Sequence, residues 1–351
     1  MTVRVAINGF GRIGRNFFRA AKAQGADIDF VAVNDLGSIE TMAHLLKYDT
    51  VAGPYPGPVK ASKQGITVDG DRLQVLSERN PEDLPWDELD IDVVIESTGI
   101  FRSKEEAGRH RTAGAKKVIV SAPSGDADAT LVVGVNDESY KPARHHVVSN
   151  ASCTTNCLAP MVKVIDEAFG LQQGLMTTIH AYTGDQALVD GPHRDARRGR
   201  AAAVNVVPTS TGAASAIGSV IRKVDGKLDG SAIRVPVPAG SLTDLTVVTK
   251  KATDVEAINA AFKAAARSGP LRKVLEYSED PLVSSDIVGN PASCVFDAPL
   301  TQGSGNLFKI FGWYDNEVGY SCRLVDLAMI LGTKKAPAKK AAKRSKKAAS
   351  K

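Results

Sequence analysis

The sequence of 351 residues is poor in cysteine, with only four, at positions 153, 157, 294 and 322. Scaffolds held together by disulfides are dense in cysteine, and four in a chain of this length do not suggest such a framework. No pair has CxxC spacing, and no cysteines and histidines are grouped at the spacing of a zinc site. We therefore expect reduced thiols and no metal centre.

Long apolar runs are also missing, since none approaches the roughly 18 residues that span a bilayer. The opening MTVRVAINGF has a strand-like alternation in place of a secretory signal, and no period of 20 to 50 residues marks a repeat protein. Hydrophobic residues make up 43% of the sequence, enough for a large core, and the length suggests about two domains. These features predict a globular protein of the cytoplasm with no membrane segment.

Acidic residues are absent from the last 18 positions, KKAPAKKAAKRSKKAASK, which hold nine Lys and Arg. In the rest of the chain 35 basic residues face 39 acidic ones, so the body is mildly acidic although the whole chain carries +5. A bulk nucleic-acid surface is therefore not expected on the body. The tail at 334–351 is predicted to be disordered when free, because like charges repel and nothing apolar is present to bury. It either binds nucleic acid or another polyanion weakly and in a salt-sensitive way, or is a solvated extension without function.

The first 150 residues alternate short apolar runs with segments of helical period. The apolar runs are VRVAIN, DFVAVND, DVVIEST, KKVIVSAP and HHVVSN, and the helical segments are RIGRNFFRAAKAQ, IETMAHLLKYD and KEEAGRHRTAG. Because parallel strands need crossover connections, this rhythm predicts an α/β domain with a parallel sheet over roughly residues 1–150.

After Cys153 the rhythm changes, and longer strands follow one another. The pairs are SAIRVPVP with LTDLTVVTK and SCVFDAP with LFKIFGWYD, and the helical VEAINAAFKAAAR lies between them. This order predicts an α+β second domain with a mixed or antiparallel sheet. The final NEVGYSCRLVDLAMIL predicts an amphipathic helix, but its own residues do not indicate what it packs on.

The stretch NGFGRIGR places Gly9, Gly11 and Gly14 as GxGxxG between a predicted strand and a predicted helix. In that context Gly9 permits a tight turn, Gly11 lets the backbone approach a pyrophosphate, and Gly14 allows close helix packing. Asp35 ends the second strand 21 residues after Gly14, close to the spacing at which a carboxylate bonds the adenosine ribose. The pattern predicts a Rossmann-type domain that binds NAD, since a carboxylate there would repel the 2′-phosphate of NADP.

Cys153 in ASCTTNC has three possible roles: a small buried hydrophobe, a disulfide partner of Cys157, or a nucleophile. Apolar residues follow it at helical spacing, namely Leu158, Met161, Val162, Ile165 and Phe169. They place Cys153 in the first turn of a helix, where free backbone N–H groups and the helix dipole favour the thiolate and lower its pKa. Local sequence does not decide between the inert thiol and the nucleophile.

His180 is the best partner for a nucleophilic Cys153, because it ends the apolar strand in LMTTIHAYTGD and strand ends commonly line sites. An ordinary hydrogen-bonded histidine remains the alternative. The other five histidines lie in predicted helices, turns or loops beside charged residues: His44, His110, His145, His146 and His193.

A family resemblance rests on ten motifs in a fixed order: NGFGRIGR, AVND, HLLKYD, ESTG, KKVIVSAP, SNASCTTNCLAP, HAYTGDQ, PTSTGAA, RVPVP and WYDNEVGYS. Over about residues 2–332 the chain resembles the phosphorylating glyceraldehyde-3-phosphate dehydrogenases. The resemblance implies a glycolytic enzyme, usually a homotetramer. It also implies a nucleotide-binding domain at 1–152 completed by a C-terminal helix at 316–332, a catalytic domain at 153–315, and a tail at 334–351 that the family normally lacks.

The resemblance further implies the chemistry of the site. Cys153 attacks the aldehyde of glyceraldehyde 3-phosphate, and His180 accepts the hydroxyl proton while hydride passes to NAD. Inorganic phosphate then displaces the cysteine from the thioester to give an acyl phosphate. The backbone N–H of Cys153 and the His180 side chain are the expected oxyanion donors.

Several residues match the family's ligand contacts. Thr183, Asp185 and Arg234 match the region of the substrate phosphate, and Ser152, Thr154, Thr211 and Gly212 match the region of inorganic phosphate. For the cofactor, Arg12 and Ile13 match adenosine-side contacts, Ser121 lies near the nicotinamide ribose, and Asn316 matches the residue that bonds the nicotinamide amide.

The arginines of HRDARRGR at 193–200 match a loop at the family's subunit interface, so we expect Arg197→Glu or Arg198→Glu to weaken the oligomer. Two other functions stay open. One is erythrose-4-phosphate dehydrogenase, which shares the cysteine chemistry but uses water in place of phosphate. The other is a binding protein that works through the basic tail.

Overall fold

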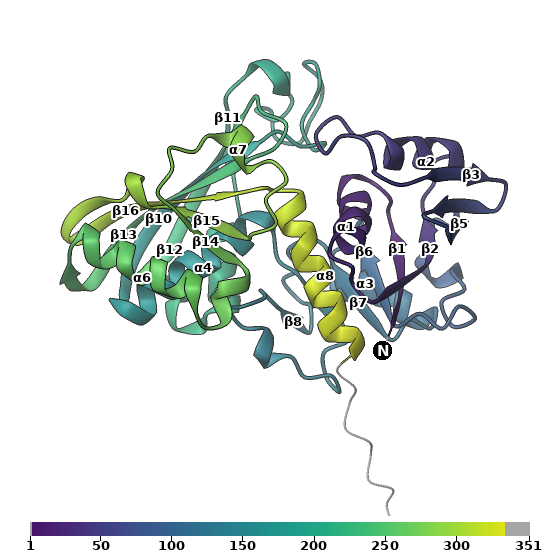
Figure 1. Ribbon diagram of the computed structural model, residues 1–351, viewed down its shortest axis with the longest axis horizontal. Helices are drawn as coiled ribbons and strands as arrows, with labels where there is room; N and C mark the ends of the chain where they lie inside the picture. The colour runs from purple at the N-terminus through teal and green to yellow at the C-terminus, as the bar shows by residue number, and fades with distance from the viewer. Residues whose placement is uncertain (1, 334–351) are drawn as a thin grey trace, which may run out of the picture.

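The computed structural model describes residues 2–333, and the predicted tail at 334–351 lies outside them. Two sheets organise these residues, and Figure 1 shows them side by side with a C-terminal helix between them. The first sheet has nine strands in the order β3-β4-β5-β2-β1-β6-β7-β9-β8, and the second has seven in the order β11-β12-β10-β13-β16-β15-β14.

The first sheet is parallel at its centre, as the sequence predicts. Its strands are β1 (Val3–Asn8), β2 (Ile28–Asn34), β3 (Val59–Ser62), β4 (Gly65–Val68), β5 (Asp71–Leu76), β6 (Val93–Glu96), β7 (Lys117–Val120), β8 (Ala129–Thr130) and β9 (Val147–Ser149). β1 pairs in parallel with β2 and β6, and β7 pairs in parallel with β6 and β9.

One edge of this sheet departs from the predicted parallel arrangement, because β3 pairs antiparallel with β4 and β4 with β5. The turn between β4 and β5 is Asp69-Gly70, with φ of 54° and 94°. Two successive positive φ values fit a two-residue hairpin turn, which joins neighbouring antiparallel strands without a crossover helix.

Helices cover this sheet where the helical patterns predict them. They are α1 (Arg12–Ala23), α2 (Ile39–Lys47) and α3 (Lys104–Thr112), with the short turn η1 (Pro81–Asp83) before β6. The expected C-terminal helix is α8 (Val318–Thr333), the yellow helix of Figure 1, and it packs on α1, β1, β6 and β7. The contact is close, because a Cβ on Gly332 would come within 2.3 Å of Val3.

The second sheet is mixed, in agreement with the predicted α+β class. Its strands are β10 (Leu171–Ala181), β11 (Val207–Ser210), β12 (Leu228–Val235), β13 (Ser241–Thr253), β14 (Leu275–Ser278), β15 (Cys294–Asp297) and β16 (Gln302–Tyr314). Two strand pairs are parallel, β10 with β12 and β14 with β15, and the other pairs are antiparallel.

Only one face of the second sheet is covered by helices among residues 2–333. Along β13 fully buried positions alternate with partly exposed ones, the pattern of a strand with one buried face. The covering helices are α4 (Cys153–Ala168), α5 (Ala213–Val220) and α6 (Val255–Arg267), and the short α7 (Ser284–Ile287) contacts β13 and β16.

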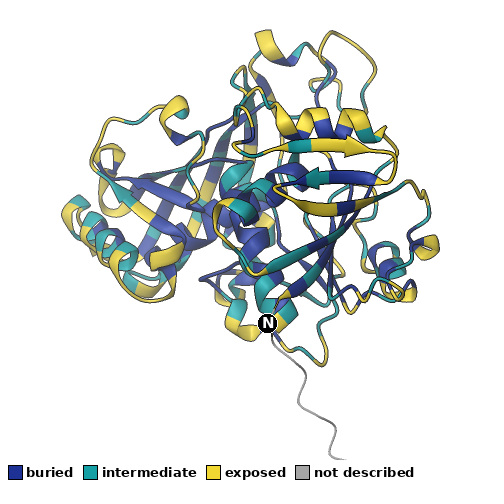
Figure 2. Ribbon diagram, turned by 45° about the vertical axis from the view of Figure 1, so that its right-hand side comes forward, coloured by how far each residue is buried: buried dark blue, intermediate teal, exposed yellow. Residues whose placement is uncertain are grey.

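Figure 2 shows the buried residues concentrated in the strands and in the helices between the sheets. One continuous apolar core includes residues of both sheets, of α4 and of α8. Within the described part of the chain, no helix combines the length and the apolar character that crossing a bilayer requires.

Candidate active site

The helix that carries Cys153 begins where the sequence predicts. Ser152 caps α4 by accepting a hydrogen bond from the Thr155 backbone N–H at 3.0 Å, so Cys153 is the first helical residue. The residue before the cap, Ala151, has φ of 56°, a left-handed conformation that is uncommon for a side chain with a Cβ. The Tyr320 hydroxyl donates to the Ala151 carbonyl at 3.1 Å, and the Ala151 N–H donates to Ser149 at 3.0 Å. Buried contacts therefore fix the turn into the helix.

The Cys153 sulfur lies 3.4 Å from Nε2 of His180, so the fold brings together the two residues singled out for chemistry. His180 is the next-to-last residue of β10 and only 5% exposed, whereas Cys153 is partly exposed. All four cysteines are free thiols, including Cys157, which is fully buried with its sulfur directed to the Gly312 carbonyl at 3.4 Å.

The contacts of Nδ1 assign the tautomer of His180. Nδ1 lies 2.7 Å from the Ala181 carbonyl and 2.8 Å from Nη1 of Arg234. The carbonyl can only accept, and Arg234 Nη1 has other acceptors in Ala181 at 3.1 Å and Thr183 at 3.4 Å. We therefore assign the proton to Nδ1, which leaves Nε2 free to accept the proton of the facing thiol.

The electrostatics of the pair differ from the sequence prediction. Burial raises the pKa of the Cys153 thiol, and the charge of Arg234 and the backbone N–H of Thr154 oppose this rise without cancelling it. The backbone N–H groups at the helix start lower this pKa, as the sequence predicts, but burial outweighs them and the net direction is upward. Burial and, secondly, the Arg234 charge lower the pKa of His180 to about 3, so the imidazole is neutral at pH 7.

Sequence reasoning missed Tyr314, which ends β16 and is 2% exposed. Its hydroxyl lies 2.8 Å from the hydroxyls of both Thr154, on α4, and Thr178, on β10. Its ring meets the His180 ring edge to face, with centroids 5.9 Å apart. Tyr314 thus ties the helix of the nucleophile to the strand of the base. A tyrosine some 160 positions from Cys153 gives no local signal of such a contact.

Arg234 lies beside His180 because β12 pairs with β10 in parallel and the two residues are register partners. Thr183 is within 3.4 Å of the Arg234 guanidinium, as the predicted substrate-phosphate group requires. Asp185 is instead paired with Arg198 and lies 3.8 Å from His193. The guanidinium of Arg234 is therefore the charged donor nearest to the reactive pair.

The residues predicted for inorganic phosphate are only partly brought together. Ser152 precedes Cys153, but its hydroxyl is engaged as the helix cap. The Thr154 hydroxyl is buried against Tyr314, so its side chain is not available to an anion in this arrangement. Thr211 and Gly212 form the start of α5, where the Thr211 hydroxyl accepts from the Ala213 N–H at 3.2 Å, and α5 packs against α4.

The three glycines of GxGxxG have the geometry expected of a dinucleotide turn. Gly9 has φ of 91°, and a Cβ there would lie 2.6 Å from the Thr98 backbone nitrogen. A Cβ on Gly14 would lie 2.3 Å from the Gly9 carbonyl oxygen, so only glycine permits this packing. A Cβ on Gly11 would meet no atom within 4 Å, and within residues 2–333 no side chain caps α1 there. Open space before a free helix N-terminus fits a pyrophosphate.

Arg12 and Ile13 follow Gly11 in the first turn of α1. The Arg12 guanidinium is committed to ion pairs with Asp49 and Glu317, and the Glu317 hydrogen bond is the main reason that its pKa is raised. Its side chain therefore joins α1 to the start of α8, and only its backbone faces the turn. The Asp35 carboxylate, just after β2, accepts from the N–H groups of Phe10 at 2.7 Å and Gly37 at 3.0 Å.

The two residues predicted for the nicotinamide side lie at the carboxyl ends of strands. Ser121 follows β7, and its N–H donates to the Glu96 carbonyl at 2.9 Å. Asn316 follows β16, is 5% exposed and accepts from the Ser241 hydroxyl at 3.0 Å. Ser241 in turn accepts from the Ala181 N–H at 3.0 Å, so Asn316 is linked to the residue after His180.

His110 lies in a helix among charged neighbours, as the sequence predicts, but the sequence does not indicate its burial. It is fully buried, on the inner side of α3, and bonded to Trp86 and Glu96. The sequence around it, EEAGRHRTAG, is so polar that the small inward-facing stripe of Ala107 and His110 is not apparent.

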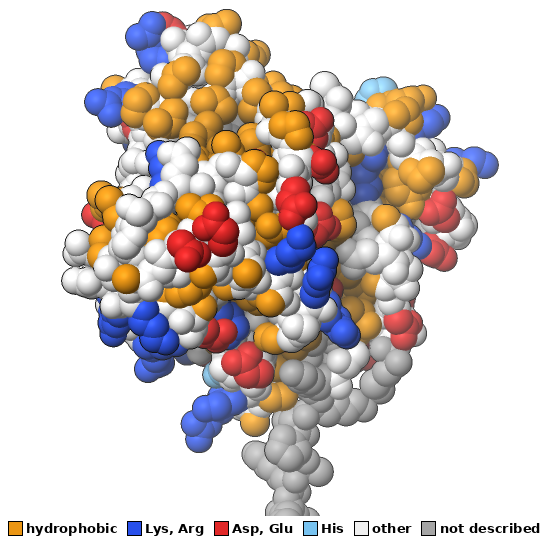
Figure 3. Space-filling model, turned by 60° about the vertical axis from the view of Figure 1, so that its left-hand side comes forward, with side chains coloured by type: hydrophobic (Ala, Val, Ile, Leu, Met, Phe, Trp, Pro, Cys, Tyr) orange, Lys and Arg blue, Asp and Glu red, His pale blue; other side chains and the backbone are white. Residues whose placement is uncertain are grey.

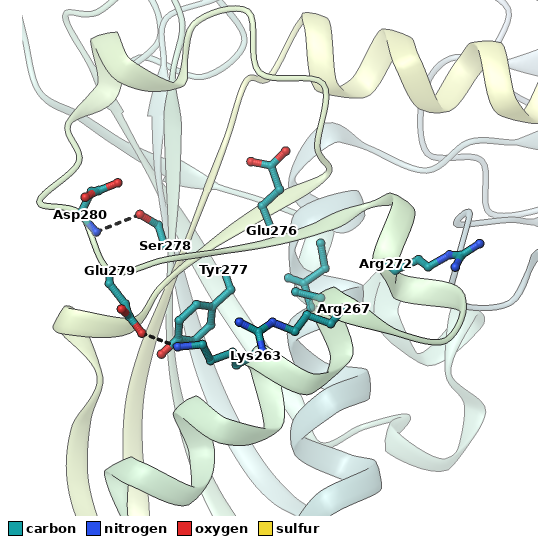
Figure 4. Close-up of a pocket in the computed structure, with 10 residues that line it drawn as sticks. Lys263, Arg267, Arg272, Glu276, Tyr277, Ser278, Glu279 and Asp280 are labelled. Carbon is teal, nitrogen blue, oxygen red and sulfur yellow. Dashed lines mark hydrogen bonds and ion pairs between the residues drawn. The ribbon is translucent and has the colours of Figure 1, made fainter.

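A separate groove of about 610 Å³ lies between α6 and β14 and is drawn in Figure 4. Lys263 pairs there with Glu279 at 2.8 Å, and the Asp280 N–H donates to Ser278 at 3.0 Å. The groove has both signs of charge, and none of the predicted site residues lines it.

Two family models match the chain. One, described as glyceraldehyde 3-phosphate dehydrogenase, NAD binding domain, matches residues 3–104. The other, described as glyceraldehyde 3-phosphate dehydrogenase, C-terminal domain, matches residues 152–316.

Similar proteins cover nearly the whole chain. A glyceraldehyde-3-phosphate dehydrogenase of Streptomyces coelicolor is 60% identical over 333 residues, which are 95% of this chain and 99% of the relative. Glyceraldehyde-3-phosphate dehydrogenase 2 of Streptomyces avermitilis is 59% identical over 333 residues, which are also 95% of this chain and 99% of the relative. A glyceraldehyde-3-phosphate dehydrogenase of Mycobacterium avium is 57% identical over 338 residues, again 95% of this chain and 99% of the relative.

Proposed function

The chain belongs to the glyceraldehyde-3-phosphate dehydrogenase family, and we propose that it oxidises D-glyceraldehyde 3-phosphate to 1,3-bisphosphoglycerate with NAD and inorganic phosphate. The observation that carries this proposal is the Cys153 sulfur 3.4 Å from a neutral His180 whose Nε2 is free to accept a proton. A thiol facing a base, beside a fixed arginine, suits attack on the aldehyde of a phosphorylated substrate.

In the first half of the reaction, Nε2 of His180 takes the thiol proton as Cys153 Sγ bonds to the aldehyde carbon. We propose the Cys153 N–H, at the start of α4, as the donor to the negatively charged oxygen of the resulting thiohemiacetal. His180 returns its proton to this oxygen, which becomes a hydroxyl, and accepts the hydroxyl proton again as the C–H bond breaks. NAD supplies the acceptor for that hydride, and the acyl group remains on Cys153 as a thioester.

In the second half, an oxygen of inorganic phosphate bonds to the thioester carbon and the C–S bond breaks. The electron pair returns to sulfur, so Cys153 leaves as a thiolate and takes up a proton again from His180. The products are the acyl phosphate, NADH and one proton. Holding the acyl group on sulfur keeps the energy of the oxidation, which hydrolysis would release.

Arg234 is proposed to bind the phosphate group of the substrate together with Thr183. Its charge lowers the pKa of both Cys153 and His180, so an anion bound to it changes the protonation of the pair. For inorganic phosphate we propose the hydroxyl of Thr211 and the backbone N–H groups of Ser152 and Gly212. Thr154 is proposed to act there through its backbone only, since its hydroxyl is engaged by Tyr314.

For the cofactor, we propose that Gly9, Gly11, Gly14 and the backbone of Arg12 and Ile13 bind the pyrophosphate side. Asp35 is proposed to bind the adenosine ribose, which favours NAD over NADP because its carboxylate repels a 2′-phosphate. Ser121 and Asn316 are proposed at the nicotinamide end. The same proposal assigns residues 1–152 and the helix at 316–332 to nucleotide binding and residues 153–315 to catalysis.

The test of the function is NADH formation from glyceraldehyde 3-phosphate and from erythrose 4-phosphate, each with and without inorganic phosphate. We expect fast, phosphate-dependent turnover of the triose that a Cys153→Ser variant abolishes. Phosphate-independent turnover that prefers the tetrose would instead identify erythrose-4-phosphate dehydrogenase, which the named relatives do not favour.

A homotetramer in the cytoplasm is the proposed state of the enzyme. Two separate surfaces expose large apolar side chains. The loop 182–206 exposes Leu188, Val189, Val204 and Val206 by 64 to 81%, and the helix-free face of the second sheet exposes Leu175 by 67% and Leu307 by 57%. Two such surfaces support two kinds of subunit contact, as a tetramer of twofold symmetry needs. Figure 3 shows hydrophobic side chains over much of the upper part of one face.

The tail at 334–351 is proposed to bind nucleic acid or another polyanion weakly through its nine basic residues. Retention of the full-length protein and of a 1–333 truncation on immobilised DNA, at low and at moderate salt, tests this idea. Greater retention of the full chain that fades with salt is expected. Equal retention of the two proteins would reject a binding role.

A further inference from the structure

A chain of buried hydrogen bonds lies beneath the glycine turn of the first sheet. Its members are Trp86, His110, Glu96, Asn8 and Asn34, none more than 5% exposed. Asn8, Asn34 and Glu96 are the last residues of β1, β2 and β6, which are neighbours in the sheet in the order β2-β1-β6. The chain therefore crosses the carboxyl ends of the three central strands, where the predicted dinucleotide site begins.

Trp86 fixes the tautomer of His110. The indole Nε1–H lies 2.9 Å from Nδ1 of His110, and an indole nitrogen can only donate. Nδ1 must therefore accept and carry no proton, so the proton of the neutral ring is on Nε2. Nε2 lies 3.0 Å from Oε2 of Glu96 and donates to it.

The Glu96 carboxylate receives four donors. Oε2 accepts from His110 and from the Asn8 side-chain amide at 2.6 Å, and Oε1 accepts from the Thr98 N–H at 2.9 Å and from the Thr98 hydroxyl. The hydroxyl donates because it is itself the acceptor for the Ile100 N–H at 3.1 Å. Four donors on two oxygens satisfy a buried ionised carboxylate, which would otherwise be costly to bury.

At its far end, the hydrogen-bond chain reaches Asn34 at the end of β2. The Asn8 side-chain oxygen accepts from the Asn34 amide at 2.7 Å, and Asn34 forms two more bonds with the backbone of Glu78. Each side-chain amide is therefore fixed in one orientation, because each end meets a partner of one kind. The direction of each hydrogen bond, from Trp86 to Asn34, is therefore consistent with the indole N–H of Trp86 being a donor only.

This chain supports the backbone on both sides of Gly9. Asn8 precedes Gly9, and Thr98 is the residue whose nitrogen would lie 2.6 Å from a Cβ on Gly9. The Gly9 N–H donates to the Asn34 carbonyl at 2.9 Å, and the Ser97 hydroxyl donates to the Gly9 carbonyl at 2.7 Å. Asp35 directly follows Asn34. A shift of the Glu96 carboxylate would thus move the turn at Gly9. It would also move Asp35, the residue proposed to bind the ribose.

We propose that His110 and Glu96 are positioning residues for the dinucleotide: His110, held in its Nε2–H form by Trp86, orients the Glu96 carboxylate, which fixes the turns at Asn8–Gly9 and Ser97–Thr98. This inference rests on the proposed use of NAD. Neither side chain touches the reactive pair, so their loss acts on cofactor affinity and not on the chemical step.

The first test is the ring tautomer of His110, read from ¹⁵N NMR of histidine-labelled wild-type protein. We expect one fully buried histidine with a protonated Nε2 and a non-protonated Nδ1, and a Trp86→Phe variant in which this single form is lost. Assignment to His110 uses the signal missing from His110→Phe. A proton on Nδ1 of His110 in the wild type would overturn the proposal.

The second test compares NAD binding by calorimetry with kcat at saturating NAD. Because bonds to a buried charge are lost, we expect the Kd for NAD to rise about tenfold in both His110→Phe and Glu96→Gln, with kcat within about twofold of wild type. Phe262→Leu is the control. It removes the ring stacked on Phe296 in the core of the second sheet, so it lowers stability without touching the hydrogen-bond chain from Trp86 to Asn34. Its Kd should stay at the wild-type value.

The outcomes separate this inference from the proposed function. Wild-type protein that binds NAD, with both variants unchanged in Kd or with the control equally weakened, would overturn the inference alone. Wild-type protein that binds no NAD would overturn the proposed function and the inference with it. If His110→Phe does not fold, the Kd of Glu96→Gln decides, and the signal that changes in Trp86→Phe assigns the tautomer of His110.

Discussion

Arg234 acts on both members of the reactive pair, because its guanidinium lies 2.8 Å from His180 and its charge lowers the pKa of Cys153 as well. Replacing it with glutamine removes that charge, so both pKa values rise. We expect the pH midpoint for alkylation of Cys153 by iodoacetamide to move upward by about one pH unit. Arg272→Gln, in the groove of Figure 4, removes an equal charge away from the site. An equal change in that control would show that net charge, not position, sets the effect.

The Tyr314 hydroxyl bonds both Thr154 and Thr178, and it thereby joins the helix that carries Cys153 to the strand that carries His180. Tyr314→Phe leaves two buried hydroxyls facing an apolar ring edge, which costs about 1–3 kcal/mol. We expect lower stability in urea together with a fall in kcat of about tenfold, since the sulfur-to-imidazole distance is no longer held. Urea unfolding and steady-state rates check both effects, and an unchanged kcat would mean that the pair is held by other contacts.

The sequence predicts where Cys153 and His180 lie in the fold but not their electrostatics. Cys153 at a helix start and His180 at a strand end follow from local patterns. The pKa of Cys153 does not, because it depends on burial in the folded protein and on the charge of Arg234, which lies far along the chain. The same reason hides His110, whose partners are 14 and 24 positions away.

At the scale of elements, alanine substitutions of the three glycines between β1 and α1 should differ in their effects on stability and on NAD affinity. Gly9→Ala and Gly14→Ala place a Cβ within 2.6 and 2.3 Å of backbone atoms, so each should lower stability by about 1–3 kcal/mol. Gly11→Ala meets no atom and should leave stability nearly unchanged, but its methyl group takes the space proposed for the pyrophosphate. Thermal unfolding and NAD titration of all three check this order. Full NAD affinity in Gly11→Ala would place the pyrophosphate elsewhere.

Most elements could be predicted, and the errors have a common physical origin. The helices α1, α4 and α6 are recognisable in the sequence by apolar residues at helical spacing. The sequence does not reveal the antiparallel edge β3-β4-β5, because β3 and β4 have only four residues each and β3 and β5 are largely polar. Likewise α8 was predicted as a helix, but its burial on α1 and β1 is a property of the assembled fold.

At the scale of the molecule, the two exposed apolar surfaces predict stepwise dissociation. Leu188→Asp, on the loop, and Leu307→Asp, on the sheet face, should each reduce a tetramer to dimers, and the double variant should give monomers. Sedimentation velocity distinguishes the three states. Tetramers in the double variant would show that neither surface is an interface.

Two arginines of the loop at 193–200 differ in what they contact. Arg198 bonds Thr209 and Asp185 of its own chain, so Arg198→Glu breaks the loop itself. Arg197 is the better probe of assembly, because the glutamate acts on whatever lies outside the subunit. We expect Arg197→Glu to weaken the tetramer while the thermal unfolding of the subunit changes little.

The position of α8 at the end of the described chain also determines when, during synthesis, the first sheet and its helices can be fully covered. The first sheet is complete in sequence by Ser149, yet the helix that covers α1 and β1 is the last element of the described chain. During synthesis the ribosome therefore presents a nucleotide-binding half with an uncovered apolar side until some 170 further residues have emerged. A nascent chain stalled before Val318 should be held by chaperones and cut by proteases at sites that the released protein protects.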